Sequence, residues 1–389
     1  MPKLTLKGLD IRVHFGSNNK SVLPRNVGIF GTVGSGKTNS AQVLIEEASA
    51  TGWAVIVLDV EGEYISMDKP SSEILTQKNM KYLAENKFKI EAKGLDVFEV
   101  YFPSNTETNR KDALEFSIPF GGLSPYELSE IMSMNENQED RFISLWDSVK
   151  EKILNSNTVR KQPDNIWKKI DVNGIDNIYE DDEYPDLTLN EMIKGVNEKV
   201  KEAKGSDRSS WLVVKRLLGR LKRFQIFDST EEELNPLDFL KPGKVSVLDL
   251  SGSYNVKVNN IVIAYLLKKI FDFKIKDENL PPVIIFIEEA HTFVSRQNAD
   301  KMEALLDRLR EVARRGRKRW LSLCFISQQP SHLPDEIYEL CNTKLIHQTT
   351  GSRNLNALKV SAGSINEAVW DEVPILGQGR CVIILKFLY

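Results

Sequence analysis

The chain has 389 residues, of which 41% are hydrophobic, and its formal net charge at pH 7 is −3. This length allows one large domain with an insertion, or two domains, and the hydrophobic content is ample for a buried core. The small net charge excludes a global basic field that would attract nucleic acid or membrane, so any DNA contact has to come from local basic patches.

The cysteine content and the termini bear on the cellular compartment. The three cysteines, Cys324, Cys341 and Cys381, are scattered and show no metal-ligand spacing, which favours a reducing cytosol. The N-terminus lacks the apolar core of a signal peptide. No stretch reaches the ~18 apolar residues of a membrane span. We therefore expect a cytoplasmic protein without membrane contact.

The first 26 residues are expected to form a short β-hairpin. Apolar and polar residues alternate over residues 4–15, which is typical of one or two strands, and Gly16-Ser17-Asn18-Asn19 favours a turn.

A glycine-rich motif follows directly. The apolar run Val27–Phe30 predicts a strand, Gly31–Thr38 matches the phosphate-binding pattern G-x-x-x-x-G-K-T, and apolar spacing over residues 37–51 predicts the helix that should follow. Glycines let successive backbone N–H groups converge on a polyphosphate, and a helix N-terminus favours anions. The motif predicts binding of a nucleoside triphosphate, ATP in our interpretation, by Gly31, Val33, Gly34, Ser35, Gly36, Lys37, Thr38 and Asn39.

Two side chains of this motif have expected chemical roles. Lys37 would reach the β- and γ-phosphates, and the Thr38 hydroxyl would ligate Mg²⁺.

An acidic turn follows the next predicted strand. Residues 54–58 form a continuous apolar run, as expected for a strand buried on both faces of a parallel sheet. The run ends in Asp59-Val-Glu-Gly-Glu-Tyr64. Ligands of open α/β sheets bind at the carboxyl ends of the strands, so these acids could be functional. They could equally cap the next element, and position alone does not decide between the two.

The middle of the chain is expected to be a mainly helical insertion over residues 105–235, between a first core part (27–104) and a second (236–389). Ser124 followed by Pro125 favours a helix start. The other elements predicted in this half are a charged helix over 71–95, a strand over Val97–Phe102 stopped by Pro103, helices over 126–160 and 188–225, and an exposed acidic loop over 171–186.

The second half resumes an alternation of strands and helices. Such alternation behind a phosphate loop predicts an α/β fold with a mostly parallel sheet and helices on both faces. The predicted strands are 244–250, 282–287, 321–326, 344–348 and 379–387, and the predicted helices are 259–273, which should be amphipathic, and 299–316.

Polar residues close two of these strands. An NTPase site needs an acid at a strand end to hold Mg²⁺, often beside a second acid that activates water. Glu288 takes the magnesium position and Glu289 the base position. Gln328, at the end of the neighbouring strand, could hydrogen-bond the attacking water or the γ-phosphate. His291 is interpreted as a turn residue that couples this loop to a neighbour.

Two basic clusters leave alternatives open. Residues 307–320 carry seven Lys and Arg residues, which could supply an arginine finger to the next subunit, bind a nucleic-acid backbone, or form a solvated helix face. Because this run ends at an edge of the sheet, we favour the finger, from Arg314 or Arg317. For the second cluster, DNA contact and plain solvation are equally plausible; it comprises Lys215, Arg216, Arg220, Lys222 and Arg223.

Taken together, these features resemble the HerA branch of the FtsK/HerA ATPases, which are hexameric DNA-pumping motors. The resemblance covers nearly the whole chain. Its most specific carriers are the Glu-Gly-Glu-Tyr turn at 61–64, the Gly-Arg-Lys stretch at 316–318 and the Ser-Gln-Gln-Pro turn at 327–330. Further carriers are Gly31–Thr38, Val97–Pro103, Phe116–Pro119, Val247–Ser251, Ile287–Phe293 and Cys341–Thr343.

The resemblance implies a RecA-like core, ATP hydrolysis at subunit interfaces and a ring threaded by duplex DNA. It implies that Gln328 is a sensor, that a trans-acting arginine lies near Gly316–Lys318, and that the acids of the 59–63 turn are functional. Archaeal members carry an N-terminal β-barrel, of which only the hairpin is expected here.

The resulting hypothesis is an ATP- and Mg²⁺-dependent homo-hexameric motor that moves along double-stranded DNA in DNA processing, repair or anti-phage defence. The alternative is an ATP-gated ring that scaffolds and regulates a partner nuclease or another effector without pumping DNA.

Overall fold

The computed structural model describes residues 3–6, 9–12, 23–70, 94–155, 187–229, 233–253, 255–293, 303–363 and 365–385. The predicted helix over 71–95, apart from its last two residues, and the predicted loop over 171–186 lie outside these ranges.

A nine-stranded sheet forms the centre of the molecule, in the order β11-β10-β3-β9-β8-β4-β7-β5-β6. Every neighbouring pair is parallel except β10 and β11, so the prediction of a mostly parallel α/β fold is confirmed. The strands are β3 (Asn26–Phe30), β4 (Ala54–Asp59), β5 (Phe98–Pro103), β6 (Leu114–Phe116), β7 (Val245–Asp249), β8 (Val283–Ile287), β9 (Leu321–Ser327), β10 (Cys341–His347) and β11 (Cys381–Leu385).

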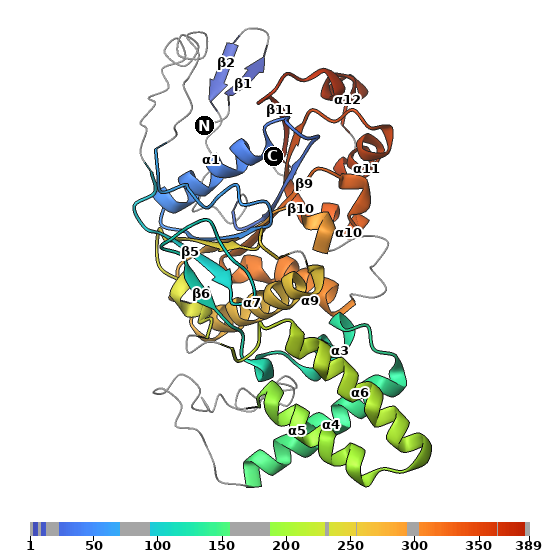
Figure 1. The fold of residues 1–389 in the computed structure, drawn as a ribbon. Coiled ribbons are helices and arrows are strands. Elements are labelled where there is room, and N and C mark those ends of the chain that lie inside the picture. The colour runs from blue at the N-terminus through green and yellow to red at the C-terminus, as the bar shows by residue number, and fades with distance from the viewer. Residues whose placement is uncertain are drawn as a thin grey trace.

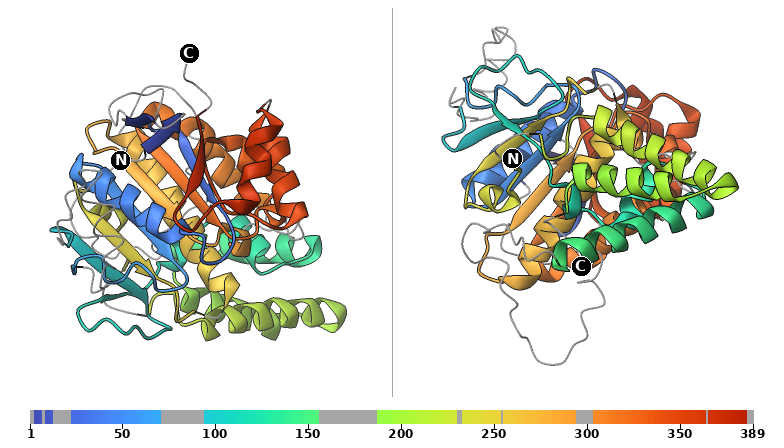
Figure 2. Two further views of the ribbon diagram at one scale, coloured as in Figure 1. Left: turned by 90° about the horizontal axis from the view of Figure 1, so that it is seen from above. Right: turned by 60° about the horizontal axis from the view of Figure 1, so that its bottom comes forward.

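Helices cover both faces of this sheet (Figures 1 and 2). Successive residues of β4 point to opposite faces, as strand geometry requires. Val55 and Val57 join the core on the side of α1 (Lys37–Ala50), whereas Ile56 and Leu58 join the larger core on the other side. That larger core contains α7 (Val256–Lys276), α9 (Glu303–Arg315), and residues of the inserted helices.

The helix predicted over residues 259–273 is confirmed, but the prediction that it is amphipathic is wrong. Helix α7 is longer and is buried on nearly every side, because it packs against α9, α3, α8 and the turn η2 (Pro236–Phe239) as well as the sheet. Even Lys274 is buried, and its ammonium is satisfied by the carbonyls of Leu280 and Pro281.

The inserted helices are shorter than predicted. The helix expected over 126–160 is two helices, α3 (Pro125–Ile131) and α4 (Glu136–Asn155), with Ser133 in the left-handed region between them. The helix expected over 188–225 is also two, α5 (Leu189–Glu202) and α6 (Gly205–Arg223), because the chain is extended at Ala203. The predicted cap is confirmed, since Ser124 and Glu127 form a capping box at α3.

The inserted segment leaves and rejoins the sheet at one place. Strand β6, within the segment expected to be mainly helical, pairs with β5. Just after it, bridges join Ser117 to Glu233 and Ile118 to Phe227. The four inserted helices therefore project together below the sheet (Figure 1).

The N-terminal hairpin turns earlier than predicted. Strands β1 (Lys3–Leu6) and β2 (Leu9–Arg12) pair antiparallel with Leu6 opposite Leu9, so the chain reverses between these residues. The turn predicted at 16–19 lies outside the described residues.

The remaining elements lie mostly in the C-terminal third. They are η1 (Phe120–Gly122), α8 (Ala290–Phe293), η4 (Gly316–Arg319), η5 (Pro330–His332), α10 (Asp335–Leu340), α11 (Ser352–Ala362), α12 (Glu367–Glu372) and η6 (Val373–Ile375). Within the described residues, no helix combines the length and apolarity needed to span a bilayer.

Candidate nucleotide-binding site

The glycine-rich loop joins β3 to α1, in the context that the motif requires. Gly36 is the N-cap of α1 with a φ of 105°, and no side chain caps the first N–H groups of the helix. A Cβ at Gly36 would lie 3.0 Å from the Gly379 Cα atom, so both backbone conformation and packing require glycine there. The uncapped N–H groups and the helix dipole form an anion-binding site.

Lys37 is folded back onto its own loop. Its ammonium donates to the Thr32 carbonyl at 3.0 Å, and the residue is only 6% exposed. Burial lowers the pKa of Lys37, while the nearby carboxylates of Glu289, Glu63 and Glu288 act in the opposite direction. The cation is thus held beside the loop with three acids around it.

The carboxylates of the acidic turn after β4 have two different roles. Asp59 is fully buried and accepts hydrogen bonds from the backbone N–H groups of Gly62, Glu63 and Tyr64, so it shapes its own turn. That turn presents Glu63 to the loop, where its carboxylate accepts the Thr38 hydroxyl at 2.6 Å. Both alternatives left open by the sequence therefore occur: Asp59 caps the turn, and Glu63 contacts the phosphate loop.

Glu288 directly follows β8 and is buried at the same edge of the sheet as the glycine-rich loop. It is 3% exposed and accepts a hydrogen bond from the Glu61 N–H. Burial raises the pKa of Glu288, and the adjacent Asp59 raises it further, because two carboxylates close together disfavour ionisation of both. A divalent cation bound here would reduce the electrostatic repulsion between the Glu288 and Asp59 carboxylates.

Glu289 has a strained backbone, with a φ of 44°. This conformation turns its side chain towards β9. The carboxylate lies 3.0 Å from His291 Nδ1 and 3.5 Å from the Gln328 backbone nitrogen. His291 in turn lies 3.2 Å from the Ser327 hydroxyl, so it connects the ends of β8 and β9 as the sequence interpretation expected.

Arg314 and Arg317 lie at the opposite edge of the sheet. Asn26, the first residue of β3, donates to the Ala313 carbonyl and accepts from the Leu323 N–H near the start of β9. The glycine loop lies at the other end of β3, about 16 Å away along five residues. The basic run does end at an edge of the sheet, but at the edge formed by the amino ends of the strands. Neither arginine therefore reaches the glycine loop of its own chain.

Sequence reasoning missed the C-terminal segment that encloses the loop. Thr32 donates from its N–H and its hydroxyl to the Gln348 carbonyl, and the Gly379 N–H donates to the Ser35 carbonyl. The His347 ring, fully buried at the end of β10, lies 3.0 Å from the Ser40 hydroxyl of α1. These residues are over 300 positions from the loop, and no local pattern marks them.

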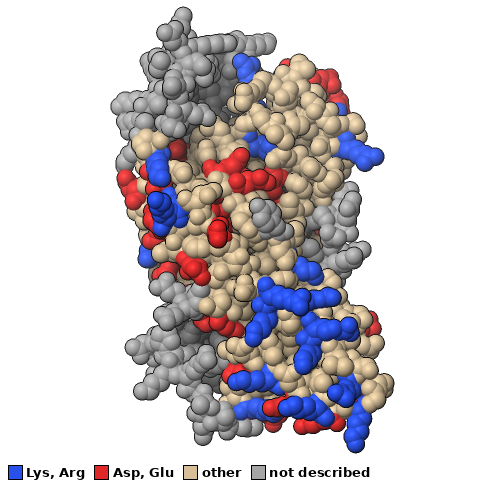
Figure 3. Space-filling model, viewed as in Figure 1, with Lys and Arg blue, Asp and Glu red and all other residues tan. Residues whose placement is uncertain are grey.

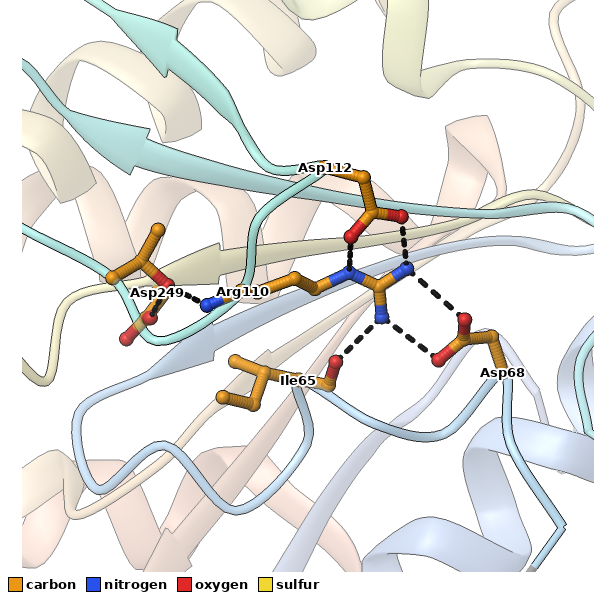
Figure 4. Close-up of polar contacts among 6 residues, drawn as sticks. Ile65, Asp68, Arg110, Asp112 and Asp249 are labelled. Atoms are coloured by element: carbon orange, nitrogen blue, oxygen red, sulfur yellow. Dashed lines mark hydrogen bonds and ion pairs between the residues drawn. The ribbon is translucent and has the colours of Figure 1, made fainter.

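A second unpredicted feature, centred on Arg110, ties together the loops beside the site (Figure 4). Its guanidinium donates to the Ile65 carbonyl and to the carboxylates of Asp68 and Asp112. Its backbone N–H donates to Thr108, whose hydroxyl donates to Asp249 at the end of β7. This network fixes the loop after β5 against the loop that carries Glu63.

The donor set fits a nucleotide with Mg²⁺. The loop offers backbone N–H groups and Lys37 to phosphates, and hard oxygen donors, suited to Mg²⁺, come from Thr38, Glu63 and Glu288. Among the described residues, no group of three or more His, Cys, Asp and Glu side chains is arranged to hold a metal ion alone. In P-loop NTPases the phosphates of the nucleotide supply part of the Mg²⁺ coordination.

Family models match nearly the entire chain. Residues 5–270 match "Helicase HerA, central domain", and residues 225–383 match "Helicase HerA-like C-terminal".

Individual relatives are distant. The DNA double-strand break repair helicase HerA of Pyrococcus furiosus is 22% identical over 93% of this chain and 63% of its own length. The protein of that name from Sulfurisphaera tokodaii is 23% identical over 97% and 65%. The chain thus spans just under two thirds of these relatives.

Solved structures show the same fold at lower identity. VirB4 of Thermoanaerobacter pseudethanolicus superposes with a TM-score of 0.63 at 14% identity, covering 97% of this chain and 91% of that one. The plasmid coupling protein TrwB, in complex with ADP and Mg²⁺, gives 0.56 at 11% identity, covering 100% and 87%. The RecA-like P-loop fold expected from the sequence is thereby confirmed.

Proposed function

Because the chain belongs to the HerA helicase family, a family of P-loop ATPases, we propose that it hydrolyses ATP with Mg²⁺ and moves along double-stranded DNA as a homo-hexameric ring. The observation that supports this proposal best is the convergence of Lys37, Thr38 and the acids Glu288 and Glu289 at one edge of the sheet. Process and compartment remain predictions: DNA processing, repair or anti-phage defence in the cytoplasm.

The residues of this edge have distinct proposed roles. The loop N–H groups from Gly31 to Thr38, with Val33 and Asn39 alongside, bind the phosphates, and Lys37 neutralises their charge. Mg²⁺, when bound by Thr38 and Glu288, would offset the charge that develops on the phosphate oxygens.

Glu289 is the proposed general base. It is buried and connected through His291 to β9, so its carboxylate is positioned to take a proton from the attacking water. Gln328, next to it, is the proposed sensor that hydrogen-bonds this water or the γ-phosphate.

Completion of the site by a neighbouring subunit is the second part of the proposal. Because Arg314 and Arg317 lie at the opposite edge of the sheet, they would act on the nucleotide of another chain, as a trans-acting finger requires.

The test is the ATPase rate with and without duplex DNA. We expect stimulation by duplex in the wild type, and a fall of at least about a hundredfold in Lys37→Ala. Lys194→Ala, an exposed lysine on α5, is the matched control and should behave like the wild type. ATP hydrolysis that duplex DNA does not stimulate would count against translocation and favour the alternative, a ring that regulates a partner nuclease or other effector.

A further inference from the structure

We propose that the outer face of α6 binds the phosphodiester backbone of duplex DNA, at a surface separate from the nucleotide site. This inference rests on the proposed function, since it says where the proposed DNA partner is held on the inserted helices. The surface consists of Lys215, Arg216, Gly219, Arg220, Lys222 and Arg223, and is called the α6 face below.

The α6 face is the solvent side of an amphipathic helix. Trp211, Val214, Leu217, Leu218 and Leu221 are buried against the other inserted helices. All five basic residues on the opposite side are exposed. Lys and Arg side chains gather in the lower part of Figure 3, where Figure 1 places α6.

Among the residues that the structure describes, the α6 cations have no acidic partner. Within the described part of the chain, none of Lys215, Arg216, Arg220 and Arg223 forms an ion pair. Lys222 only approaches the Asn190 side-chain oxygen at 3.5 Å.

Helix α9 shows what an ordinary charged helix face does in this molecule. Arg308 and Arg315 pair with Glu311, and Arg310 pairs with Asp307 and Glu336. Three of the seven cations in that run are thus paired with acids. The α6 face keeps its positive charge for a partner.

Helix stability does not account for the whole cluster. Arg220, Lys222 and Arg223 lie in the last turn, where cations interact favourably with the helix dipole. Lys215 and Arg216 lie further from that end, beyond the reach of this effect. Moreover, Lys257 of α7 lies near Arg220, and burial together with this like charge lowers the pKa of Lys257. Cations have gathered here despite their repulsion.

Gly219 adds a second, independent observation. Glycine inside a helix costs roughly 0.5–1 kcal/mol relative to alanine. Its φ is not positive, and a Cβ at this position would meet no atom within 4 Å, so nothing in the described part of the chain requires glycine here. Its absence of side chain leaves bare helix backbone between two pairs of cations, Lys215–Arg216 and Lys222–Arg223, where a sugar-phosphate chain can lie close.

The composition of the face favours duplex over single-stranded nucleic acid. Single strands are held largely by bases stacked on aromatic side chains. On α6 the only exposed large apolar residue is Leu212, and Trp211 is buried. Charges spread over nine residues, about 12 Å of helix, match contact with successive phosphates of one duplex strand.

The experiment measures binding of the full chain to a fluorescent duplex across a series of salt concentrations. The α6 variant combines Lys215→Gln, Arg216→Gln, Arg220→Gln and Arg223→Gln. The matched control removes the same charge beside it through Lys194→Gln, Lys199→Gln, Lys201→Gln and Lys204→Gln. We expect the α6 variant to lose at least about tenfold in affinity and to reduce the slope of log K against log salt by about 3–4. The control should change affinity less than about twofold, and ATP hydrolysis without DNA should stay unchanged in both.

Gly219→Leu tests close approach without removing charge. We expect an unchanged or raised melting temperature and a severalfold loss of duplex affinity. Unchanged duplex affinity in Gly219→Leu would show that the DNA backbone does not lie close to α6 at Gly219.

Other outcomes separate the inference from the proposed function. Equal losses of duplex affinity in the α6 variant and its control would overturn the α6 face as a DNA-binding surface but not the proposed motor. A variant that loses binding to phosphatidylserine vesicles but keeps its duplex affinity would do the same. A wild-type chain that fails to bind duplex would overturn both the face and the proposed motor.

Discussion

At the scale of single residues, the environment assigns different tasks to acids that look alike in the sequence. Asp59 and Glu63 are separated by four positions, yet one shapes the turn through three backbone hydrogen bonds and the other meets Thr38. Glu288 and Glu289 are adjacent, yet one faces Asp59 and the other faces β9, because the left-handed backbone at Glu289 rotates its side chain away.

This division predicts the effect of Glu289→Gln. Glutamine keeps the size of the side chain but cannot take a proton, so we expect ATP hydrolysis to fall by about 10²–10⁴-fold. Binding of a fluorescent ATP analogue should persist, because the loop and Lys37 are untouched. Glu278→Gln, at an exposed acid after α7, serves as the control. A Glu289→Gln rate close to that of the wild type would assign the base elsewhere.

At the scale of elements, the phosphate loop is held between its own strand and helix and the C-terminal strands. Ser40 of α1 contacts His347 of β10, and the connection between β10 and β11 supplies Gln348 and Gly379 to the loop backbone. The conformation of the loop therefore depends on residues from the opposite end of the chain.

Because of this packing, stability should depend on pH through His347. Burial lowers the pKa of His347 from 6.5 to about 4. Well above pH 6.5 the ring is neutral in both the folded and the unfolded state. Between pH 6.5 and about 4 the unfolded chain takes up a proton that the folded chain does not, so stability falls as pH decreases. The loss reaches about 3 kcal/mol at the low end of this range.

Urea unfolding at several pH values measures this effect. His347→Gln should flatten the slope between pH 6.5 and 4, whereas His332→Gln, at an exposed position, should leave it unchanged. An identical slope in wild type and His347→Gln would show that other groups dominate.

At the scale of the whole molecule, charge and chemistry are distributed unevenly. A net charge of −3 coexists with a basic face on α6 that forms no ion pair among the described residues. The two candidate finger arginines lie across the sheet from the phosphate loop. A single chain thus presents a loop at one edge and arginines at the other, as a ring of head-to-tail contacts would use them.

Mixing inactive variants tests this arrangement. Arg314→Ala and Lys37→Ala subunits should each be inactive alone. Mixed in equal amounts, they should regain about a quarter of the wild-type rate, because about one interface in four would join an intact loop to an intact arginine. The same mixture with Arg317→Ala identifies which arginine acts. If no mixture recovers activity, the arginines do not act in trans, and a native mass measurement would then establish whether a ring forms at all.

Features that depend on contiguous residues were predicted well. The strand, loop and helix around Gly31–Thr38 and the capped start of α3 at Ser124 formed as expected, because their conformations depend on neighbours in the sequence. Helix breaks near Ser133 and Ala203 were missed, although the stretches that follow them, residues 135–141 and 204–210, contain no hydrophobic residue and so interrupt the apolar periodicity. The burial of α7 was missed because helices from both halves of the chain cover it.

The sequence by itself determined that this chain has a phosphate-binding loop in a mostly parallel α/β sheet, since glycine conformations and buried strand patterns are local properties. Only the tertiary structure decided which acids meet the loop, that His347 and Gln348 enclose it, and at which edge the arginines lie. Those outcomes depend on strand order and on contacts between residues hundreds of positions apart, which no local pattern encodes.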